Sequence, residues 1–284
     1  MTVREALRLF EMQLADLYPL NECRHIGKLF LGHRLNYSNT DFLTKGDTPL
    51  DANMEEDIRI ALLRLKNGEP IQYILQRAWF MDMELMVRPG VLIPRPETEE
   101  LVQWIVDDYA ASSPNVLDIG TGSGCIAAGI ARYLPAARVH AWDMSDDALA
   151  VASANARNLD VNVGFSKVDV LDLPNHLPHE PFNVIVSNPP YVTMSEKRHM
   201  HPNVLDHEPH LALFVDDRDA LLFYRAIGRL GFQLLSPNGR LYFEINEAQG
   251  HQTVRLLEGL GYANVVLKAD LQGKHRMVRA DVSR

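Results

Sequence analysis

The chain has 284 residues, of which 46% are hydrophobic, 28 are basic and 37 are acidic, so its net charge is −9. Residues 1–95 hold 12 basic and 13 acidic residues, and residues 96–284 hold 16 and 24, which gives partial charges of −1 and −8. The length predicts one large domain plus a small one, and the acidic C-terminal part argues against tight binding to duplex nucleic acid, which normally requires a basic face.

The N-terminal end carries Arg4, Glu5 and Arg8, which is unlike a secretory signal peptide. No uncharged run reaches the ~18 residues of a membrane span. Cys23 and Cys125 lie far apart in the sequence and lack the spacing of metal ligands, so we interpret them as free thiols in a reducing compartment. These features predict a cytoplasmic protein without membrane association.

Residues 1–77 are predicted to form a small helical domain. Thr2 and Glu5 fit a capping box, and apolar residues then recur at helical spacing. A further helix is predicted from Asn53 to Lys66, with Gly68 as its stop signal. We interpret the apolar stripes as core and the domain as a whole as a candidate docking surface for a macromolecular substrate.

Residues 78–95 are predicted to be a β-hairpin linker, because two apolar stretches, Trp79–Val87 and Val91–Ile93, flank Arg88-Pro89-Gly90. Prolines and acidic residues then mark the start of a helix at Pro96. Arg95 is a candidate substrate-binding residue; the alternative is a surface arginine at a domain junction.

The next pattern is a strand, a glycine loop and a helix. The predicted strand Val116–Ile119 contains Asp118 and leads into Gly120-Thr121-Gly122-Ser123-Gly124. The first two glycines let a ligand approach the backbone closely, and the third can begin the helix, whose N-terminus favours negative groups. The spacing is G-x-G-x-G rather than the G-x-G-x-x-G of dinucleotide sites, and Asp118 favours a ligand with an amine over a pyrophosphate.

Two acidic residues follow the next predicted strands. Asp143 ends the strand from Arg138, where a carboxylate can accept from both hydroxyls of a ribose. Asp169 is placed to accept from an adenine amino group, and Val170 to pack on the ring. Each aspartate alone also fits a cap or turn. Together with Asp118 and the loop from Gly120 to Gly124, they describe a pocket for ribose, adenine and an amino acid, which is S-adenosylmethionine (SAM).

The apolar run Val184-Ile185-Val186 predicts a buried strand that stops at Asn188-Pro189-Pro190-Tyr191, because proline cannot continue a sheet ladder. Asn188 then lies where open α/β sheets bind ligands. Its side-chain oxygen and the backbone oxygen of Pro189 can accept both N–H bonds of a planar NH2 group and favour the charge gained on attack. Tyr191 offers an aromatic face. The motif predicts alkylation of an amide or exocyclic amine; the alternative is a plain proline-terminated turn.

The remaining sequence predicts the rest of an α/β sheet. Residues 192–212 hold four histidines, and we interpret them as a flexible loop over the site rather than a metal site, since no zinc spacing is present. The elements predicted after it are a helix over Leu221–Leu234, a turn at Ser236–Gly239, a strand over Arg240–Ile245, a helix over Val254–Leu260 and an antiparallel pair, Val265–Lys268 with Arg276–Ala280. This alternation predicts a mostly parallel sheet with helices on both faces.

The chain resembles the release factor glutamine methyltransferases (the HemK/PrmC family) over nearly its whole length. The motifs that carry the resemblance are Pro70–Ile74, Val91–Glu99, Asp118–Gly124, Asn188–Tyr191, Glu208–His210 and Gly273–Arg276. The resemblance implies a seven-stranded, Rossmann-like class I methyltransferase domain over residues 96–284 behind the helical domain. It places SAM contacts on Gly120 to Gly124, Asp143, Val170 and Asn188, and substrate contacts on Asn188 to Tyr191. Some relatives carry an aromatic residue where Val170 stands, so we expect the adenine contact there to be weaker or purely apolar.

The resemblance also implies methyl transfer from SAM to the side-chain amide nitrogen (N5) of the glutamine in the Gly-Gly-Gln motif of peptide chain release factors, with S-adenosylhomocysteine as product. We expect a monomer that needs no metal and binds no nucleic acid stably, with Asn188, Pro189 and Tyr191 as catalytic residues. Three alternatives remain: glutamine methylation of a ribosomal protein, adenine-N6 methylation of nucleic acid, and a module that binds without catalysis. Pro94–Glu99 looks closer to the release-factor group, the acidic charge argues against the second, and the intact Asn-Pro-Pro-Tyr argues against the third.

Overall fold

The computed structural model describes residues 1–173 and 180–282. The chain divides into two compact units, and in the sequence the second is interrupted by a short piece of the first. Unit 1 comprises Met1–Arg77 and His201–His207, and unit 2 comprises Ala78–Met200 and Glu208–Arg284.

Unit 1 is a bundle of helices. They are α1 (Val3–Leu14), α2 (Leu20–Leu35), α3 (Asn39–Thr44), α4 (Ala52–Lys66), α5 (Ile71–Leu75) and α9 (Pro202–His207). The predicted capping box is confirmed, since Thr2 Oγ1 accepts from the Glu5 amide and the Glu5 carboxylate accepts from the Thr2 amide. Phe10, Phe30 and Ile58 lie in its buried core, as the helical spacing of the apolar residues predicted. The short helices α3 and α5 were not predicted.

The segment after the Asn-Pro-Pro-Tyr motif is more regular than the predicted loop. It forms β7 (Val192–Thr193), η1 (Glu196–His199), α9, α10 (His210–Leu213) and β8 (Phe214–Val215). Within unit 1, Asn203 Nδ2 donates to Tyr18 Oη at 2.5 Å, and His207 Nε2 lies 3.1 Å from the Asn67 carbonyl oxygen. The middle of this segment is therefore part of the helical unit.

The predicted hairpin is present, but its turn lies elsewhere. Strands β1 (Arg77–Phe80) and β2 (Met83–Met86) pair around Met81, whose φ is 55°. The prediction of a strand at Val91–Ile93 was wrong: Val91 is buried against Ala148 and Val151 of α8 (Asp146–Asn158) without strand geometry. Apolar residues in a buried coil and in a strand give similar short sequence patterns.

Unit 2 contains the predicted seven-stranded sheet, in the order β10-β11-β9-β6-β3-β4-β5. Its strands are β3 (Asn115–Ile119), β4 (Arg138–Asp143), β5 (Val163–Lys167), β6 (Phe182–Ser187), β9 (Leu235–Glu244), β10 (Ala263–Ala269) and β11 (His275–Asp281). Strands β3, β4, β5, β6 and β9 are parallel, and β11 is antiparallel to both β9 and β10. The predicted closing antiparallel pair is confirmed.

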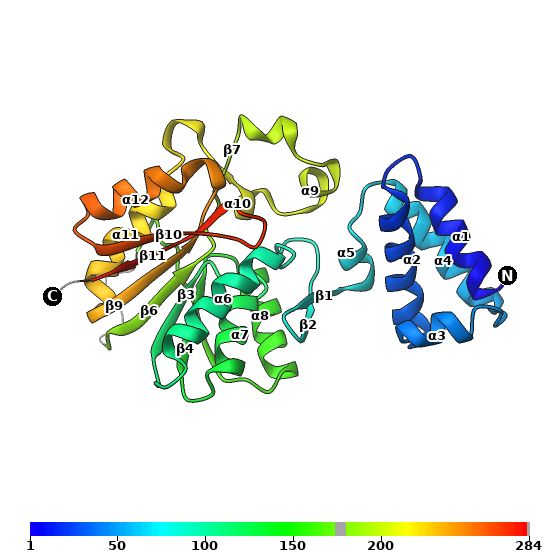
Figure 1. The fold of residues 1–284 in the computed structure, drawn as a ribbon, viewed down its shortest axis with the longest axis horizontal. Helices are drawn as coiled ribbons and strands as arrows, with labels where there is room; N and C mark the ends of the chain where they lie inside the picture. Colours follow the sequence, from blue (N-terminus) through cyan, green and yellow to red (C-terminus); the bar gives the residue numbers. More distant parts are fainter. Residues whose placement is uncertain (174–179, 283–284) are drawn as a thin grey trace. The chain divides into compact units, whose positions relative to one another are not determined.

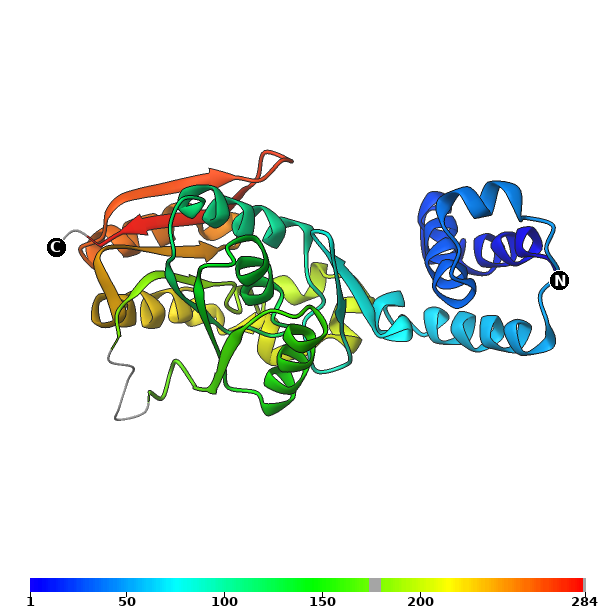
Figure 2. The same cartoon turned by 90° about the horizontal axis from the view of Figure 1, so that it is seen from below.

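Helices cover both faces of the sheet (Figures 1 and 2). They are α6 (Pro96–Tyr109), α7 (Cys125–Tyr133), α8 (Asp146–Asn158), α11 (Leu222–Leu234) and α12 (Gly250–Gly259), with 3-10 turns η2 (Asp217–Asp219) and η3 (Glu247–Gln249). Successive strand residues point to opposite faces: Val184 and Val186 pack in the core of α6 and α7, and Ile185 packs in that of α11 and α12. Burial on both faces explains the continuous apolar run that precedes Asn188.

The predicted turn at Ser236–Gly239 is a bulge inside β9. Leu235 pairs with Phe182 and Arg240 pairs with Val184, so β9 has more residues than β6 between these two pairs. Asn238, in this bulge, has a φ of 63°. Both cysteines are free and buried. None of the helices that the structure describes has the length and hydropathy needed to span a bilayer.

Candidate active site

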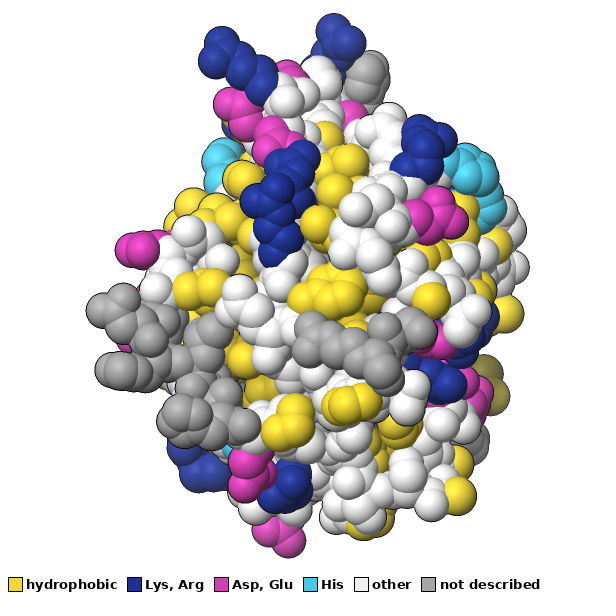
Figure 3. Space-filling view, turned by 90° about the vertical axis from the view of Figure 1, so that its left-hand side faces the viewer, with side chains coloured by type: hydrophobic (Ala, Val, Ile, Leu, Met, Phe, Trp, Pro, Cys, Tyr) yellow, Lys and Arg dark blue, Asp and Glu magenta, His cyan; other side chains and the backbone are white. Residues whose placement is uncertain are grey.

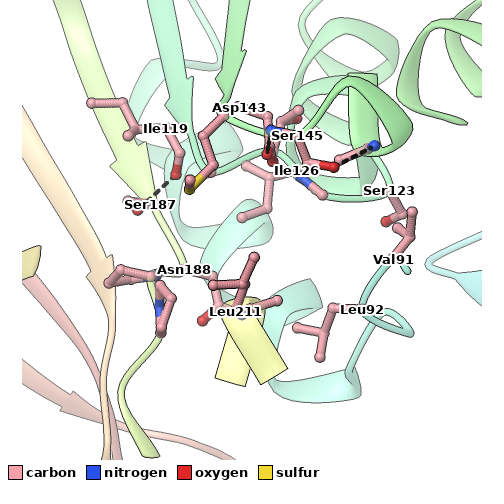
Figure 4. Close-up of a pocket in the computed structure, with 18 of the residues that line it drawn as sticks. Val91, Leu92, Ile119, Ser123, Ile126, Asp143, Ser145, Ser187, Asn188 and Leu211 are labelled. Atoms are coloured by element: carbon pink, nitrogen blue, oxygen red, sulfur yellow. Dashed lines mark hydrogen bonds between the residues drawn. The ribbon is translucent and has the colours of Figure 1, made fainter. Parts of the chain in front are cut away.

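A pocket of unit 2 opens at the carboxyl ends of the central strands. Ile119 ends β3, Asp143 ends β4 and Asn188 follows β6, and all three line the pocket (Figure 4). Leu92 and Leu211 lie opposite Asp143 in this view. Buried parallel strands bring their carboxyl ends to one edge of a sheet, which is where such sheets bind ligands.

The glycine loop shapes one wall of the pocket. Gly120 and Gly122 line it with φ values of 74° and 56°, and a Cβ built at either position meets no atom within 4 Å. Gly124 has a φ of 81°, and its built Cβ would lie 2.9 Å from Ala152 Cβ. The first two glycines therefore leave room for a ligand beside the backbone, while the third lets α7 pack against α8.

Asp143 is fixed at the pocket by two backbone amides. Its Oδ2 accepts from Gly122 N at 2.9 Å, and its Oδ1 accepts from Ser145 N at 2.9 Å. Both amides come from loops that themselves line the pocket. The carboxylate thus joins the end of β4 to the glycine loop and keeps lone pairs for a ligand.

The neighbouring wall combines a carboxylate with apolar side chains. Asp169 and Val170, two of the predicted cofactor-binding residues, line the pocket. Asp169 Oδ1 accepts from Leu171 N at 2.8 Å. Val168, Phe223 and Ile227 complete this wall. Such a wall suits a flat ring that carries a hydrogen-bond donor at its edge.

Asp118 supports the loop from beneath and is not part of the pocket wall. It is fully buried, and its Oδ2 accepts from Thr121 Oγ1 at 2.6 Å. Burial raises the pKa of Asp118 to about 7, against the opposing effect of the Thr121 hydrogen bond. Ser123 and Thr121 line the pocket, whereas Gly124 does not.

Asn188 belongs to a chain of side-chain hydrogen bonds. Asn188 Nδ2 donates to Thr98 Oγ1 at 3.3 Å, and Thr98 Oγ1 donates to Glu244 Oε2 at 2.6 Å. Tyr191 Oη donates to Glu244 Oε1 at 3.1 Å. Glu244 is buried, which raises its pKa; desolvation of the Tyr191 hydroxyl, together with the nearby Glu244 charge, raises the pKa of Tyr191. Thr98 and Glu244 were not among the predicted site residues.

The Asn-Pro-Pro-Tyr motif divides between two roles. Asn188, Pro189 and Pro190 line the pocket, but Tyr191 does not, and its hydroxyl is directed to Glu244. The aromatic contact expected for Tyr191 is therefore absent from the described pocket wall. A hydrogen bond of Asn246 Nδ2 to the Tyr191 carbonyl, 3.2 Å long, further holds the turn.

Arg95 lines the pocket and is paired with a carboxylate that the sequence analysis did not assign. Arg95 Nη2 lies 2.6 Å from Glu208 Oε1, and Glu208 Oε2 accepts from Ile93 N at 3.3 Å. Glu208 is only 4% exposed, and Pro209 and Leu211, which follow it, line the pocket. The motif Glu208-Pro209-His210, noted for its resemblance, was the signal that could have revealed this pair.

The charged side chains of the surface and of the pocket bear on what the protein can bind. Figure 3 shows the left-hand side of Figure 1, where the described Lys and Arg side chains are scattered among Asp and Glu side chains and form no continuous basic patch. Within residues 1–173 and 180–282, no group of three or more His, Cys, Asp or Glu side chains is arranged to hold a metal ion. The pocket offers carboxylates, an amide and an apolar wall, and its arginine, Arg95, is paired with Glu208, so the pocket suits a neutral or cationic organic ligand.

The fold and the site define a class I methyltransferase. A methyltransferase of Pyrococcus furiosus has the same fold, with a TM-score of 0.54 and 15% identity over 82% of this chain and 100% of its own. The methyltransferase domain profile matches residues 111–265, and the PrmC N-terminal domain profile matches residues 5–75.

Two curated relatives identify the family. The release factor glutamine methyltransferase of Bacteroides thetaiotaomicron is 45% identical over 94% of this chain and 96% of its own. That of Flavobacterium psychrophilum is 42% identical over 99% of each chain. The chain belongs to the release factor glutamine methyltransferase family.

Proposed function

We propose that the chain transfers a methyl group from SAM to the side-chain amide nitrogen of the glutamine in the Gly-Gly-Gln motif of peptide chain release factors. The observation that carries this proposal is the position of Asn188 and Pro189, which line the same pocket as the glycine loop. A site with planar-amide acceptors beside a donor pocket suits N-methylation, and the family relatives bear the corresponding name.

The pocket residues fit SAM. Gly120 and Gly122 leave open space beside the backbone, as a closely bound ligand requires. Asp143 can accept from the ribose hydroxyls, Asp169 from the adenine amino group, and Val170 can pack on the adenine ring. When bound, SAM supplies a methyl group on a positively charged sulfur.

The substrate amide is held by two oxygen atoms of the motif. Asn188 Oδ1 and the Pro189 carbonyl oxygen accept its two N–H bonds and favour the positive charge that develops on nitrogen. Transfer of the methyl group would leave the donor as S-adenosylhomocysteine and would put one proton too many on the amide nitrogen, and that proton would pass to water. Because an amide is a poor nucleophile, most of the rate must come from positioning and from these two acceptors.

Unit 1 is proposed to dock the release factor. Its helices match the PrmC N-terminal domain, which accompanies the methyltransferase domain in this chain. A release factor is a macromolecule that reaches the pocket with one loop, so contacts outside the pocket must supply much of its affinity. We infer a monomeric enzyme that acts in the cytoplasm, where release factors function.

A methyl-transfer assay with labelled SAM tests the proposal. The acceptors are purified release factor, the same factor with its Gly-Gly-Gln glutamine replaced, ribosomal protein and adenine-containing oligonucleotides. We expect label on intact release factor and none on the glutamine variant. Label on ribosomal protein or on an oligonucleotide instead would overturn the proposed substrate, and SAM binding without any transfer would overturn the catalytic role.

A further inference from the structure

The direction of the hydrogen bonds behind Asn188 is set by Glu244. Each carboxylate oxygen of this buried residue accepts a hydrogen bond from a hydroxyl group, one from Thr98 at 2.6 Å and one from Tyr191 at 3.1 Å. A carboxylate can only accept. The single proton of the Thr98 hydroxyl is therefore committed to Glu244.

This commitment leaves Thr98 Oγ1 with lone pairs alone for its other neighbour, Asn188. The Asn188 group at 3.3 Å must then be the donor Nδ2, which turns Oδ1 away from Thr98. Thr98 itself is buried, with 2% of its surface exposed, so water does not readily replace this contact. An asparagine without such a partner can rotate by half a turn about its last bond at little steric cost.

We infer that Thr98 and Glu244 are positioning residues that fix the Asn188 side chain with its oxygen toward the substrate, and thereby select glutamine over glutamate. This inference rests on the proposed function. Glutamine and glutamate side chains have nearly the same shape, so only donors and acceptors can distinguish them. An acceptor-lined site binds the NH2 of glutamine and repels the carboxylate of glutamate, which leaves buried groups unpaired.

The first test compares three variants, of which the two Thr→Val changes keep the side-chain shape. Thr98→Val removes the acceptor, and we expect kcat for release factor to fall about 5- to 30-fold while SAM affinity stays at the wild-type value. Thr98→Ser restores the hydroxyl and is expected to recover most of kcat. Thr253→Val is the matched control, because Thr253 is also buried on a helix and donates to Gln249 O at 3.0 Å outside the pocket.

The second test uses release factor with its Gly-Gly-Gln glutamine changed to glutamate as a competitive inhibitor. In Thr98→Val the Asn188 amide is free to present Nδ2, so we expect the inhibition constant to fall about 3- to 10-fold relative to the wild type. Thr98→Ser and Thr253→Val should leave it unchanged. A loss of folding or rigidity alone would not make the glutamate form bind better, and an unchanged constant in Thr98→Val overturns the inference.

A double variant shows whether Thr98 acts through Asn188. In the Asn188→Ala background, Thr98→Val should cause no further loss of kcat, because the group that it positions is gone. Additive losses would overturn the inference. The outcomes also separate the two proposals: wild-type enzyme that does not methylate release factor refutes the proposed function, whereas active wild type with fully active Thr98→Val refutes only the positioning role.

Discussion

Arg95 and Glu208 form an ion pair of 2.6 Å across the rim of the pocket. The arginine side chain is 32% exposed, but that of the glutamate is 1% exposed and also accepts from the Ile93 amide. A buried carboxylate needs such partners. The pair therefore holds the chain that begins at Pro209 beside the entry to α6.

We expect Arg95→Ala to lower the free energy of unfolding by about 1–3 kcal/mol, because Glu208 keeps its burial but loses its charged donor. Because Arg95 is partly exposed, the loss of stability should be smaller than for a fully buried ion pair. Urea denaturation measures it. Arg88→Ala is the control, since its partner Asp147 is 77% exposed and the pair contributes at most about 1 kcal/mol. Equal losses in the two variants would contradict the structural role of the Arg95–Glu208 pair.

Asn188→Ala should reduce kcat about 100-fold or more, because it removes an acceptor aimed at the reacting amide. SAM affinity should be partly retained, as measured by calorimetry. Asn183→Ala is a matched control near the other end of β6. There Asn183 Oδ1 accepts a hydrogen bond from Asn115 N, and Asn183 Nδ2 donates one to Ser236 Oγ. That control should lower stability but not kcat of the folded enzyme. Near-normal turnover of Asn188→Ala would refute the catalytic assignment.

Gly122→Ala should weaken SAM binding about tenfold or more, because its methyl group would project into the donor pocket. Gly273→Ala is the comparison: both glycines have positive φ and open space around a built Cβ, but Gly273 lies outside the pocket. Each substitution should destabilise the fold by about 1–2 kcal/mol. Calorimetric titration with SAM distinguishes them, and a similar affinity loss in both would mean that backbone strain, not the pocket, is responsible.

Asp118 predicts a pH dependence of stability. Its pKa is about 7 in the native state, whereas the carboxyl of an unfolded chain titrates near pH ~3.9. Between these values the native state binds the extra proton, so the free energy of unfolding falls as pH rises, by about 4 kcal/mol in total.

Asp118→Asn removes this titration and keeps an oxygen for Thr121. The stability of the variant relative to the wild type should therefore increase between about pH 4 and about pH 7. Urea denaturation at several pH values measures the difference. Burial raises the pKa of Glu244 too, but that residue is present in both proteins and its contribution cancels. Parallel stability curves would show that Asp118 does not titrate in this range.

Each part of the site that could be predicted is a short, continuous stretch of the chain. The strand before Asn188, the loop from Gly120 to Gly124 and the end of β4 at Asp143 each carry a local signal, either an apolar run or a glycine spacing. Parallel strands then bring these segments together without further information, because their carboxyl ends share one edge of the sheet.

Contacts between distant segments could not be predicted. Thr98 and Glu244 are 146 residues apart, and both lie in elements that the sequence did predict. Their contact depends on the register of β9 beside β6, which includes the bulge before Arg240. The hydrogen-bond partner of Tyr191 could not be predicted for the same reason, since it is again Glu244. The hairpin turn at Met81 lacks the glycine or asparagine that usually marks positive φ.

Unit 1 is encoded in two separate stretches of the sequence, and this constrains how such a protein can be cut or recombined. Asn203 and His207 have their partners, Tyr18 and Asn67, in the first 77 residues. An exchange of residues 1–77 alone between two relatives would pair a helical unit from one parent with a seven-residue insert from the other. Successful hybrids of this family should therefore inherit both stretches from the same parent.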